Sequence, residues 1–209
     1  MKHLVLSRHT LWLGCVILLV AVAQGVAQKV DSANVKTSMT KVVLFSDQSI
    51  TVPYAGGSLF RNNESVFGTI STSGIVPGHV VTLWWAIFND PSFCAGAVCA
   101  PPDLNNPLVN GSLQLGGGEI VGLSGRVNFS GYLAVGDNTG FYRLPMFPNM
   151  PDPAPGVVYP KGAEIHLVIR DHGPASSDPT ILGQQLTSFP GGCTMSNPCA
   201  NIQAAIFQR

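Results

Sequence analysis

The side chains best suited to chemistry lie in one short stretch, GAEIHLVIRDHGPA, at residues 162–175. It contains Glu164, His166, Asp171 and His172, in a chain of which only 11% of the residues are charged. Imidazole nitrogens and carboxylate oxygens are common ligands of zinc and copper in proteins. The stretch is therefore a candidate metal site, and an open coordination position there could activate water.

The alternation of residue types predicts that this stretch is a β-strand. The odd-numbered residues from 165 to 169 are apolar and are expected to face the core, whereas the even-numbered residues are mostly polar. Residues two apart on one strand face are about 7 Å apart, so Glu164 and His166 could reach one ion. His172 is expected beyond the strand end, because the sequence DHGP is typical of a turn.

One further histidine, His79, opens the apolar stretch HVVTLWWAIF at 79–88. If this stretch pairs beside residues 163–170, three imidazoles could meet. Three imidazoles that meet in this way would form a zinc or copper site. Its candidate ligands are His166, His172, His79 and Glu164. The sequence assigns no catalytic residue.

A simpler interpretation of the same residues is a strand with one solvated face. In that interpretation the charged side chains are exposed, His166 forms a hydrogen bond across strands, and Asp171 forms an Asx-turn that leads to Gly173. Spacing alone does not distinguish the two interpretations, because most strands at a surface have a polar face.

The first residues are typical of a secretory signal peptide. Lys2 and Arg8 form a basic start, an apolar run occupies 11–23, and small residues follow at Gly25 and Ala27. The run is short for a membrane span, which needs about 20 apolar residues. We predict a signal peptide at residues 1–27 and a secreted protein of the periplasm or the extracellular space.

The predicted mature chain has a size that fits one domain. Residues 28–39 are polar and aperiodic, which predicts a flexible N-terminal segment. A single β domain is expected over 40–209. No second apolar run is long enough to span a membrane, so no stable span is expected after cleavage.

Four cysteines follow the predicted signal peptide, and an even number in a secreted chain indicates two disulfides. Three pairings are possible. We favour the local pairs, Cys94–Cys99 and Cys193–Cys199, because each would close a short loop of small residues or proline. Chain entropy gives each such loop roughly 2 kcal/mol, so the disulfides are expected to shape loops more than to hold the fold.

Many short apolar or alternating runs and no convincing long helix predict an all-β chain. Turns are expected at 55–58 and 73–78. The segment 79–88 is expected to be a strand buried on both faces. The segment 180–189 is ambiguous between a strand and a short helix. The fold class predicted is an antiparallel β-sandwich or partly closed barrel with long disulfide-bearing loops. The expected strands lie at 41–45, 49–53, 65–72, 79–88, 118–125, 126–135, 163–170 and 201–207.

Composition narrows the function. Basic and acidic residues number 11 each and form no basic stripe, so nucleic acid is not expected as a partner. The primary hypothesis is a non-enzymatic extracellular binding or structural module, and the first alternative is a metal-binding protein or metalloenzyme. A second alternative is a carbohydrate-binding module that uses Trp84 or Trp85, of which one at least must face the core because neighbours on a strand point to opposite sides.

Three motifs in the second half of the chain are specific enough to compare with known families. They are TLWWAIFN at 82–89, AEIHLVIRDHGP at 163–174 and GGC at 191–193. Their pattern resembles a family of secreted bacterial proteins for which no activity is assigned, over roughly residues 80–207. The resemblance implies secretion and a β fold, and it implies no mechanism.

Overall fold

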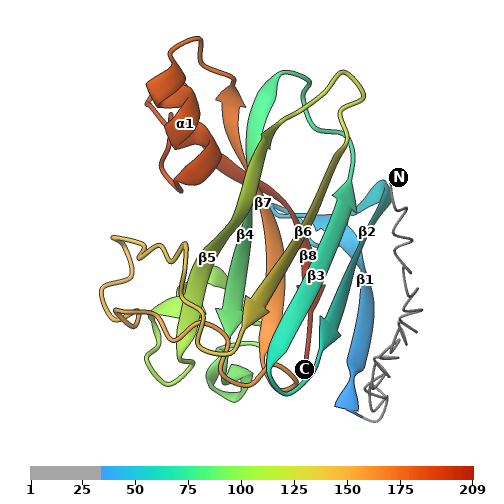
Figure 1. The fold of residues 1–209 in the computed structure, drawn as a ribbon, viewed down its shortest axis with the longest axis vertical. Coiled ribbons are helices and arrows are strands. Elements are labelled where there is room, and N and C mark those ends of the chain that lie inside the picture. The colour runs from blue at the N-terminus through green and yellow to red at the C-terminus, as the bar shows by residue number, and fades with distance from the viewer. Residues whose placement is uncertain (1–33) are drawn as a thin grey trace, which may run out of the picture. The chain divides into compact units, whose positions relative to one another are not determined.

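The computed structural model describes residues 34–209, which contain eight strands, one α-helix and two short 3₁₀ helices (Figure 1). The predicted signal peptide, at 1–27, lies outside the described residues. The strands are β1 (Lys36–Leu44), β2 (Thr51–Arg61), β3 (Ser65–Thr72), β4 (His79–Phe88), β5 (Gly111–Ile120), β6 (Val127–Ala134), β7 (Glu164–Pro174) and β8 (Ala200–Phe207). The helices are η2 (Pro91–Phe93), η3 (Pro101–Asn105) and α1 (Pro179–Thr187).

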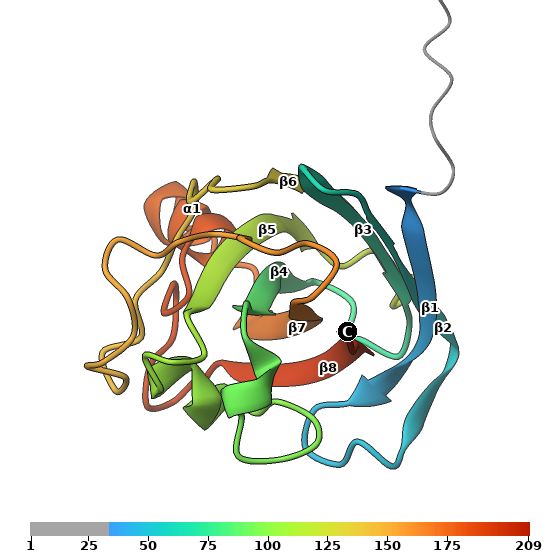
Figure 2. The same ribbon diagram turned by 90° about the horizontal axis from the view of Figure 1, so that it is seen from below.

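All eight strands form one antiparallel sheet in the order β5-β4-β7-β8-β1-β2-β3-β6. Seen along the strands, the sheet curls until its edge strands β5 and β6 come near each other (Figure 2). The all-β prediction is confirmed, in the form of a nearly closed sheet rather than two packed sheets. No helix among residues 34–209 has the length and apolar character needed to cross a membrane.

The curled sheet has apolar residues on both of its faces. Leu83, Trp85 and Ile87 of β4 point inward, where they pack with residues 165, 167 and 169 of β7. Trp84, Ala86 and Phe88 point outward and are covered by residues of the long loops after β4 and β6. These two clusters explain why the sequence of β4 is apolar at almost every position, and they confirm that both of its faces are buried.

Both tryptophans of β4 are therefore buried, each with about 1% of its surface exposed. Neither can serve as an exposed sugar platform, which overturns the tryptophan-based part of the carbohydrate hypothesis. The interior indole of Trp85 is accommodated by glycines of three other strands. A Cβ atom at Gly68, Gly116 or Gly131 would lie 2.6, 2.8 or 2.9 Å from an atom of this ring.

The outer face of β7 differs from the solvated face that its alternation suggests. Glu164, His166 and His172 have only 3%, 5% and 0% of their surfaces exposed. The loops at 89–110 and 141–163 cover the face at Glu164 and His166 with apolar side chains. At His172 the cover is formed by α1 and the loop that follows it. A polar residue beneath such a cover needs a hydrogen-bond partner, since an unpaired buried polar group is costly.

Several element boundaries differ from the sequence-based expectations. Residues 55–58 lie inside β2 and do not form a turn. Glycine occurs at position 57 because a larger residue would not fit there: a Cβ atom would lie 2.8 Å from the Cβ atom of Ala205. Strand β1 begins at Lys36, within the segment expected to be flexible, and pairs there with β2. Strand β5 begins at Gly111, earlier than expected, because its glycines conceal the strand pattern.

The ambiguous segment after β7 is helical. In α1 the carboxylate of Asp178 accepts hydrogen bonds from the backbone N–H groups of Thr180 and Ile181, and Pro179 occupies the first turn. Both features favour the start of a helix. Strand β7 itself runs on through the expected turn as far as Pro174, which pairs with His79.

Both cysteine pairs form the local disulfides that the spacing predicts. Cys94–Cys99 lies in the loop after β4, and Cys193–Cys199 lies in the loop between α1 and β8. Two disulfides are consistent with a protein of an oxidising compartment, either periplasmic or extracellular. The first loop is held by buried Asp103, whose carboxylate accepts hydrogen bonds from the N–H groups of Ala95 and Ala100.

Candidate functional site

Glu164 and His166 form a buried pair at the start of β7. The Nε2 atom of His166 lies 2.7 Å from Oε1 of Glu164, and the same oxygen accepts a hydrogen bond from the N–H of Cys99 at 2.8 Å. A carboxylate can only accept hydrogen bonds, so a neutral His166 carries its proton on Nε2. Its second nitrogen, Nδ1, is then a hydrogen-bond acceptor.

His166 lines a cavity of about 40 Å³ on the outer face of the sheet, which we call the His166 cavity. Only two of its lining residues are polar, His166 and Asn201. The imidazole packs against Phe88 at a centroid distance of 5.0 Å, and its Nδ1 atom has no hydrogen-bond partner within residues 34–209. The other lining residues are Phe45, Ala86, Phe88, Pro101, Leu104, Leu113, Leu144, Val168 and Phe189.

Arg170 and Phe189 hold the end of the cavity next to Asn201. The Nε–H group of Arg170 donates to the carbonyl of Phe189 at 2.8 Å, and its guanidinium lies 3.9 Å above the Phe189 ring. The same guanidinium donates to Oδ1 of Asn201 at 3.0 Å, which leaves the amide nitrogen of Asn201 without a partner among the described residues. The cavity therefore offers one acceptor and one donor within an otherwise apolar lining.

His172 lies further along β7 and belongs to a different network. Its Nδ1–H donates to the carbonyl of Gly191 at 2.8 Å, and its Nε2 accepts from the hydroxyl of Thr82 at 2.8 Å. The Thr82 oxygen in turn accepts from the indole N–H of Trp84 at 2.7 Å. A neutral imidazole satisfies every group in this chain of hydrogen bonds.

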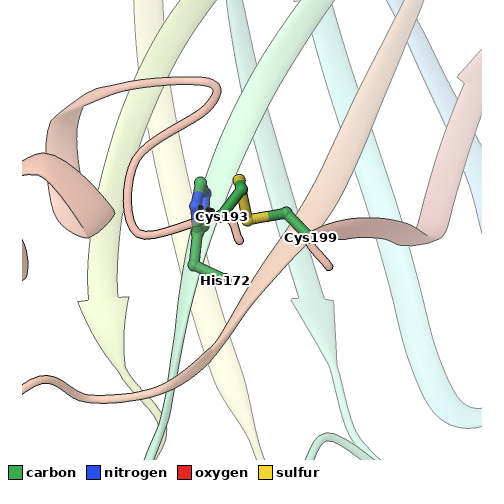
Figure 3. Close-up of side chains that lie close together, drawn as sticks. All are labelled: His172, Cys193 and Cys199. Carbon is green, nitrogen blue, oxygen red and sulfur yellow. Dashed lines mark hydrogen bonds between the residues drawn. A yellow bond between two sulfur atoms is a disulfide. The ribbon is translucent and has the colours of Figure 1, made fainter. Parts of the chain in front are cut away.

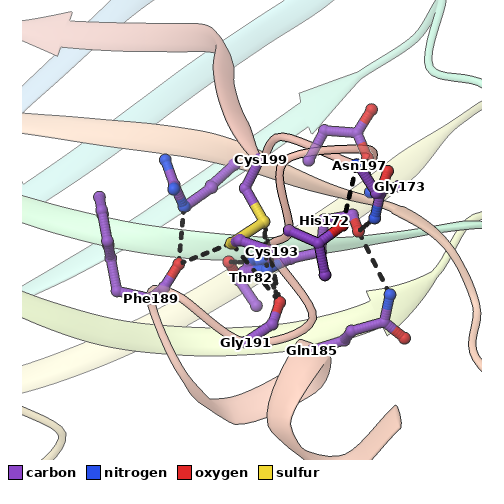
Figure 4. Close-up of a disulfide and its surroundings, with 12 residues drawn as sticks. Thr82, His172, Gly173, Gln185, Phe189, Gly191, Cys193, Asn197 and Cys199 are labelled. Atoms are coloured by element: carbon purple, nitrogen blue, oxygen red, sulfur yellow. Dashed lines mark hydrogen bonds between the residues drawn. A yellow bond between two sulfur atoms is a disulfide. The ribbon is translucent and has the colours of Figure 1, made fainter. Parts of the chain in front are cut away.

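The same imidazole anchors the second disulfide loop (Figures 3 and 4). Its ring lies beside the Cys193–Cys199 bond, with Sγ of Cys199 3.5 Å from Nδ1. The side chains of Gln185 and Asn197 both donate to the backbone carbonyl of His172. These contacts show that His172 fastens α1 and the disulfide loop to the sheet.

His79 forms a third, half-exposed contact. Its Nδ1 atom lies 3.0 and 3.1 Å from the two carboxylate oxygens of Asp171. Asp171 also accepts from the N–H of Gly173, two residues ahead, which is the Asx-turn expected there. This pair closes the end of the β4–β7 ladder.

The structure brings Glu164 together with His166, but it does not gather the four candidate ligands into one site. His166 and His172 are six residues apart on β7, which corresponds to about 20 Å along a strand. β4 does pair with β7 as the three-histidine hypothesis requires, yet each imidazole bonds to a different partner. The strand register, which spacing does not reveal, keeps them apart.

Two other groups of possible ligand atoms lie close together within the described part of the chain. They are His172 with Cys193 and Cys199, and Cys94 and Cys99 with Asp103. In both groups the sulfur atoms are joined in disulfides. The thiolate is the form of cysteine that binds metals, so neither group is a thiolate site in the oxidised protein.

The buried position of His172 predicts a loss of stability in acid. Burial lowers the pKa of His172 below 6.5, against the opposing effect of its hydrogen bond to Gly191. As the pH falls through about 6.5, His172 takes up a proton in the unfolded chain before it does so in the folded one. The free energy of unfolding therefore decreases from about pH 6.5 down to the lower pKa of the folded protein. Urea unfolding of wild type and His172→Gln, from about pH 7.5 to about pH 5.5, measures this slope.

The control for this measurement is His79→Gln, which removes a half-exposed imidazole from another contact. It is expected to keep most of the acid-dependent loss, whereas His172→Gln is expected to reduce it. An unchanged slope in His172→Gln would contradict the assignment of the acid sensitivity to this imidazole.

The residues that sequence reasoning missed are those that cover the cavity, such as Phe45, Leu104, Leu144 and Phe189. They lie in or beside loops, where no periodic pattern marks them as buried. No family model, curated protein or solved structure matches this chain.

Proposed function

We propose that this is an extracytoplasmic binding protein that holds a small apolar group bearing one hydrogen-bond donor in the His166 cavity. The observation that carries the proposal is the Nδ1 atom of His166, which has no hydrogen-bond partner among residues 34–209 and belongs to a side chain that is only 6% exposed within an apolar lining. A ligand that donates to this atom gains a hydrogen bond worth about 0.5–1.5 kcal/mol.

Glu164 supports this function because it sets which nitrogen is the acceptor. Its carboxylate holds the proton of His166 on Nε2 and is itself held by the Cys99 N–H. The first disulfide loop therefore positions the pair that recognises the ligand. Binding sites of this kind are mostly apolar, with a few oriented polar groups that give specificity.

Binding is favoured over catalysis by the composition of the cavity wall. None of the described residues that line it has a hydroxyl, thiol or amine group that His166 could activate as a nucleophile. Binding is also favoured over a zinc or copper site, since Glu164 and His166 supply only two ligand side chains and Glu164 is already engaged with His166.

The size of the cavity limits the ligand. A volume of about 40 Å³ accommodates one small group and not a whole extended molecule. A small alcohol matches the site, because its hydroxyl can donate to Nδ1 while its hydrocarbon part contacts the lining. A cavity that binds benzene has a volume of about 150 Å³, so an aromatic ring is too large for this one. Methanol and ethane are a suitable probe pair, since they are similar in size and differ by this hydroxyl.

The test is a titration of ¹⁵N-labelled protein with methanol and with ethane, in which the ring nitrogens of His166 are followed by NMR. Methanol is expected to shift the Nδ1 resonance and to bind about tenfold more tightly than ethane, a difference of about 1.4 kcal/mol for one good hydrogen bond. In His166→Phe, which keeps an aromatic ring of similar shape, this preference is expected to disappear.

His79→Phe is the matched control, because it replaces an imidazole that lies outside the cavity lining. It is expected to retain the preference for methanol. If wild type does not bind methanol, or if His166→Phe still prefers methanol to ethane, the proposed function is wrong.

A further inference from the structure

The outer face of strands β2, β3 and β6 carries a row of exposed aromatic rings, and β1 lies next to β2 in the same part of the sheet. These strands are neighbours in the sheet (Figure 1), and Phe60, Phe67 and Tyr132 lie directly opposite one another across β2, β3 and β6. Their exposed fractions are 42%, 41% and 61%. The rings of Phe60 and Phe67 have centroids 6.2 Å apart. The row therefore crosses the strands.

Hydroxyl groups occupy the positions beside this row. Ser58, Thr69 and Ser130 are paired across the same three strands, two residues further along each. The hydroxyls of Ser58 and Thr69 are 2.7 Å apart and bond to each other. The following row continues with Ser71 and Asn128. We call the aromatic row and these polar rows together the aromatic–hydroxyl face.

The aromatic–hydroxyl face is almost free of charge. Among the outward-facing paired residues of β1, β2, β3 and β6, Lys41 is the one charged side chain. Charged residues normally supply about a quarter of a globular chain and lie mostly on its surface. An uncharged partner suits a face of this composition.

We propose that the aromatic–hydroxyl face binds a neutral polysaccharide that lies across the strands. Each pyranose ring has a C–H face that can stack on an aromatic ring, and its hydroxyls can exchange hydrogen bonds with serine, threonine and asparagine. Neighbouring strands are about 4.8 Å apart, close to the length of one pyranose residue. Successive rings of the row can therefore contact successive sugars.

A depression of about 190 Å³ lies beside Phe60 and Phe67, toward the connection between β2 and β3. It is lined by these two rings, Val35, Asn62, Ser65 and the buried Arg61. It therefore adds polar side chains beside the first two rings of the row. This site is separate from the His166 cavity, because none of these residues lines that cavity.

The test is electrophoresis of the whole protein in native gels that contain a neutral polysaccharide, either hydroxyethylcellulose, xylan, galactomannan or mixed-linkage glucan. Wild type is expected to be retarded by at least one of them. Tyr132→Ala, which truncates the most exposed ring of the row, is expected to weaken the apparent affinity about tenfold. Thr69→Glu, which keeps all three rings but adds a charge in the row beside them, is expected to do the same.

Tyr159→Ala is the matched control, because Tyr159 is 65% exposed and lies in the loop before β7. It is expected to be retarded like wild type, and circular dichroism checks that each variant is folded. The proposal is overturned if no neutral polysaccharide retards wild type, or if the Tyr159 and Tyr132 variants are equally affected. It is also overturned if Tyr132→Ala abolishes a concentration-dependent dimer in place of sugar binding.

Discussion

Gly68→Val is expected to lower the free energy of unfolding by about 2–3 kcal/mol, because the interior has no room for a side chain at this position. A Cβ atom there would lie 2.6 Å from Cη2 of Trp85 and 3.2 Å from Cδ1 of Leu167. The indole cannot retreat, since Gly116 and Gly131 allow the strands on its other sides to approach it as closely. Urea unfolding followed by tryptophan fluorescence measures the loss.

Gly56→Val is the matched control for this substitution. Gly56 also lies in the sheet, but its Cβ would meet one backbone oxygen at 3.7 Å, which is ordinary contact. Its effect is expected to stay within about 0.5 kcal/mol. In the Gly68→Ala background, Trp85→Phe is expected to recover part of the lost stability. Equal losses in Gly68→Val and Gly56→Val would contradict the close packing around Trp85.

The second large effect is expected for Arg61→Met, which should cost about 3–5 kcal/mol. Arg61 is fully buried, and its guanidinium donates to four backbone carbonyls, those of Pro160, Ala163, Phe207 and Gln208. Methionine keeps an unbranched apolar stem but lacks the guanidinium and has no donor, so these carbonyls would lose their partner in a buried setting.

The guanidinium of Arg61 remains protonated at neutral pH although it is buried. Burial lowers the pKa of Arg61 to about 10, and the nearby carboxylate of Glu164 acts in the opposite direction. Lysine cannot replace it, because one ammonium does not reach four carbonyls with the planar fork of a guanidinium. Arg61→Lys is therefore expected to remain destabilised in thermal and urea unfolding.

Arg126→Met serves as the control, because Arg126 is exposed. Its effect is expected to stay within about 0.5 kcal/mol. If Arg61→Met unfolds at the same urea concentration as wild type, the buried guanidinium does not hold β8 and the loop before β7 as described.

The fold could be predicted where periodicity is strong. The unbroken apolar run of β4 predicts a strand buried on both faces, and the alternation in β7 predicts that residues 165, 167 and 169 face the core. Periodicity fails where glycine replaces a packed side chain. Gly57 and Gly116 are small because an interior neighbour occupies their space, and a single sequence does not distinguish such a glycine from one in a turn.

The candidate site could be predicted only in part. The spacing of Glu164 and His166 correctly places both side chains on one face of a strand, where they meet. The outer face of β7 is covered by loops whose sequences have no periodic pattern. The burial of Glu164 and His166 could therefore not be predicted. The separation of the three histidines depends on strand register and on the partners that each imidazole finds, which are tertiary properties.

The place of β1 between β2 and β8 affects the order in which the chain can fold during its synthesis. β1 pairs with β2, which follows it directly in the sequence, but residues 42–44 have their other partners in β8, near the far end of the sequence. Pairings between distant residues form slowly, because a long loop must first be closed. The sheet therefore cannot close until residues 200–207 have left the ribosome.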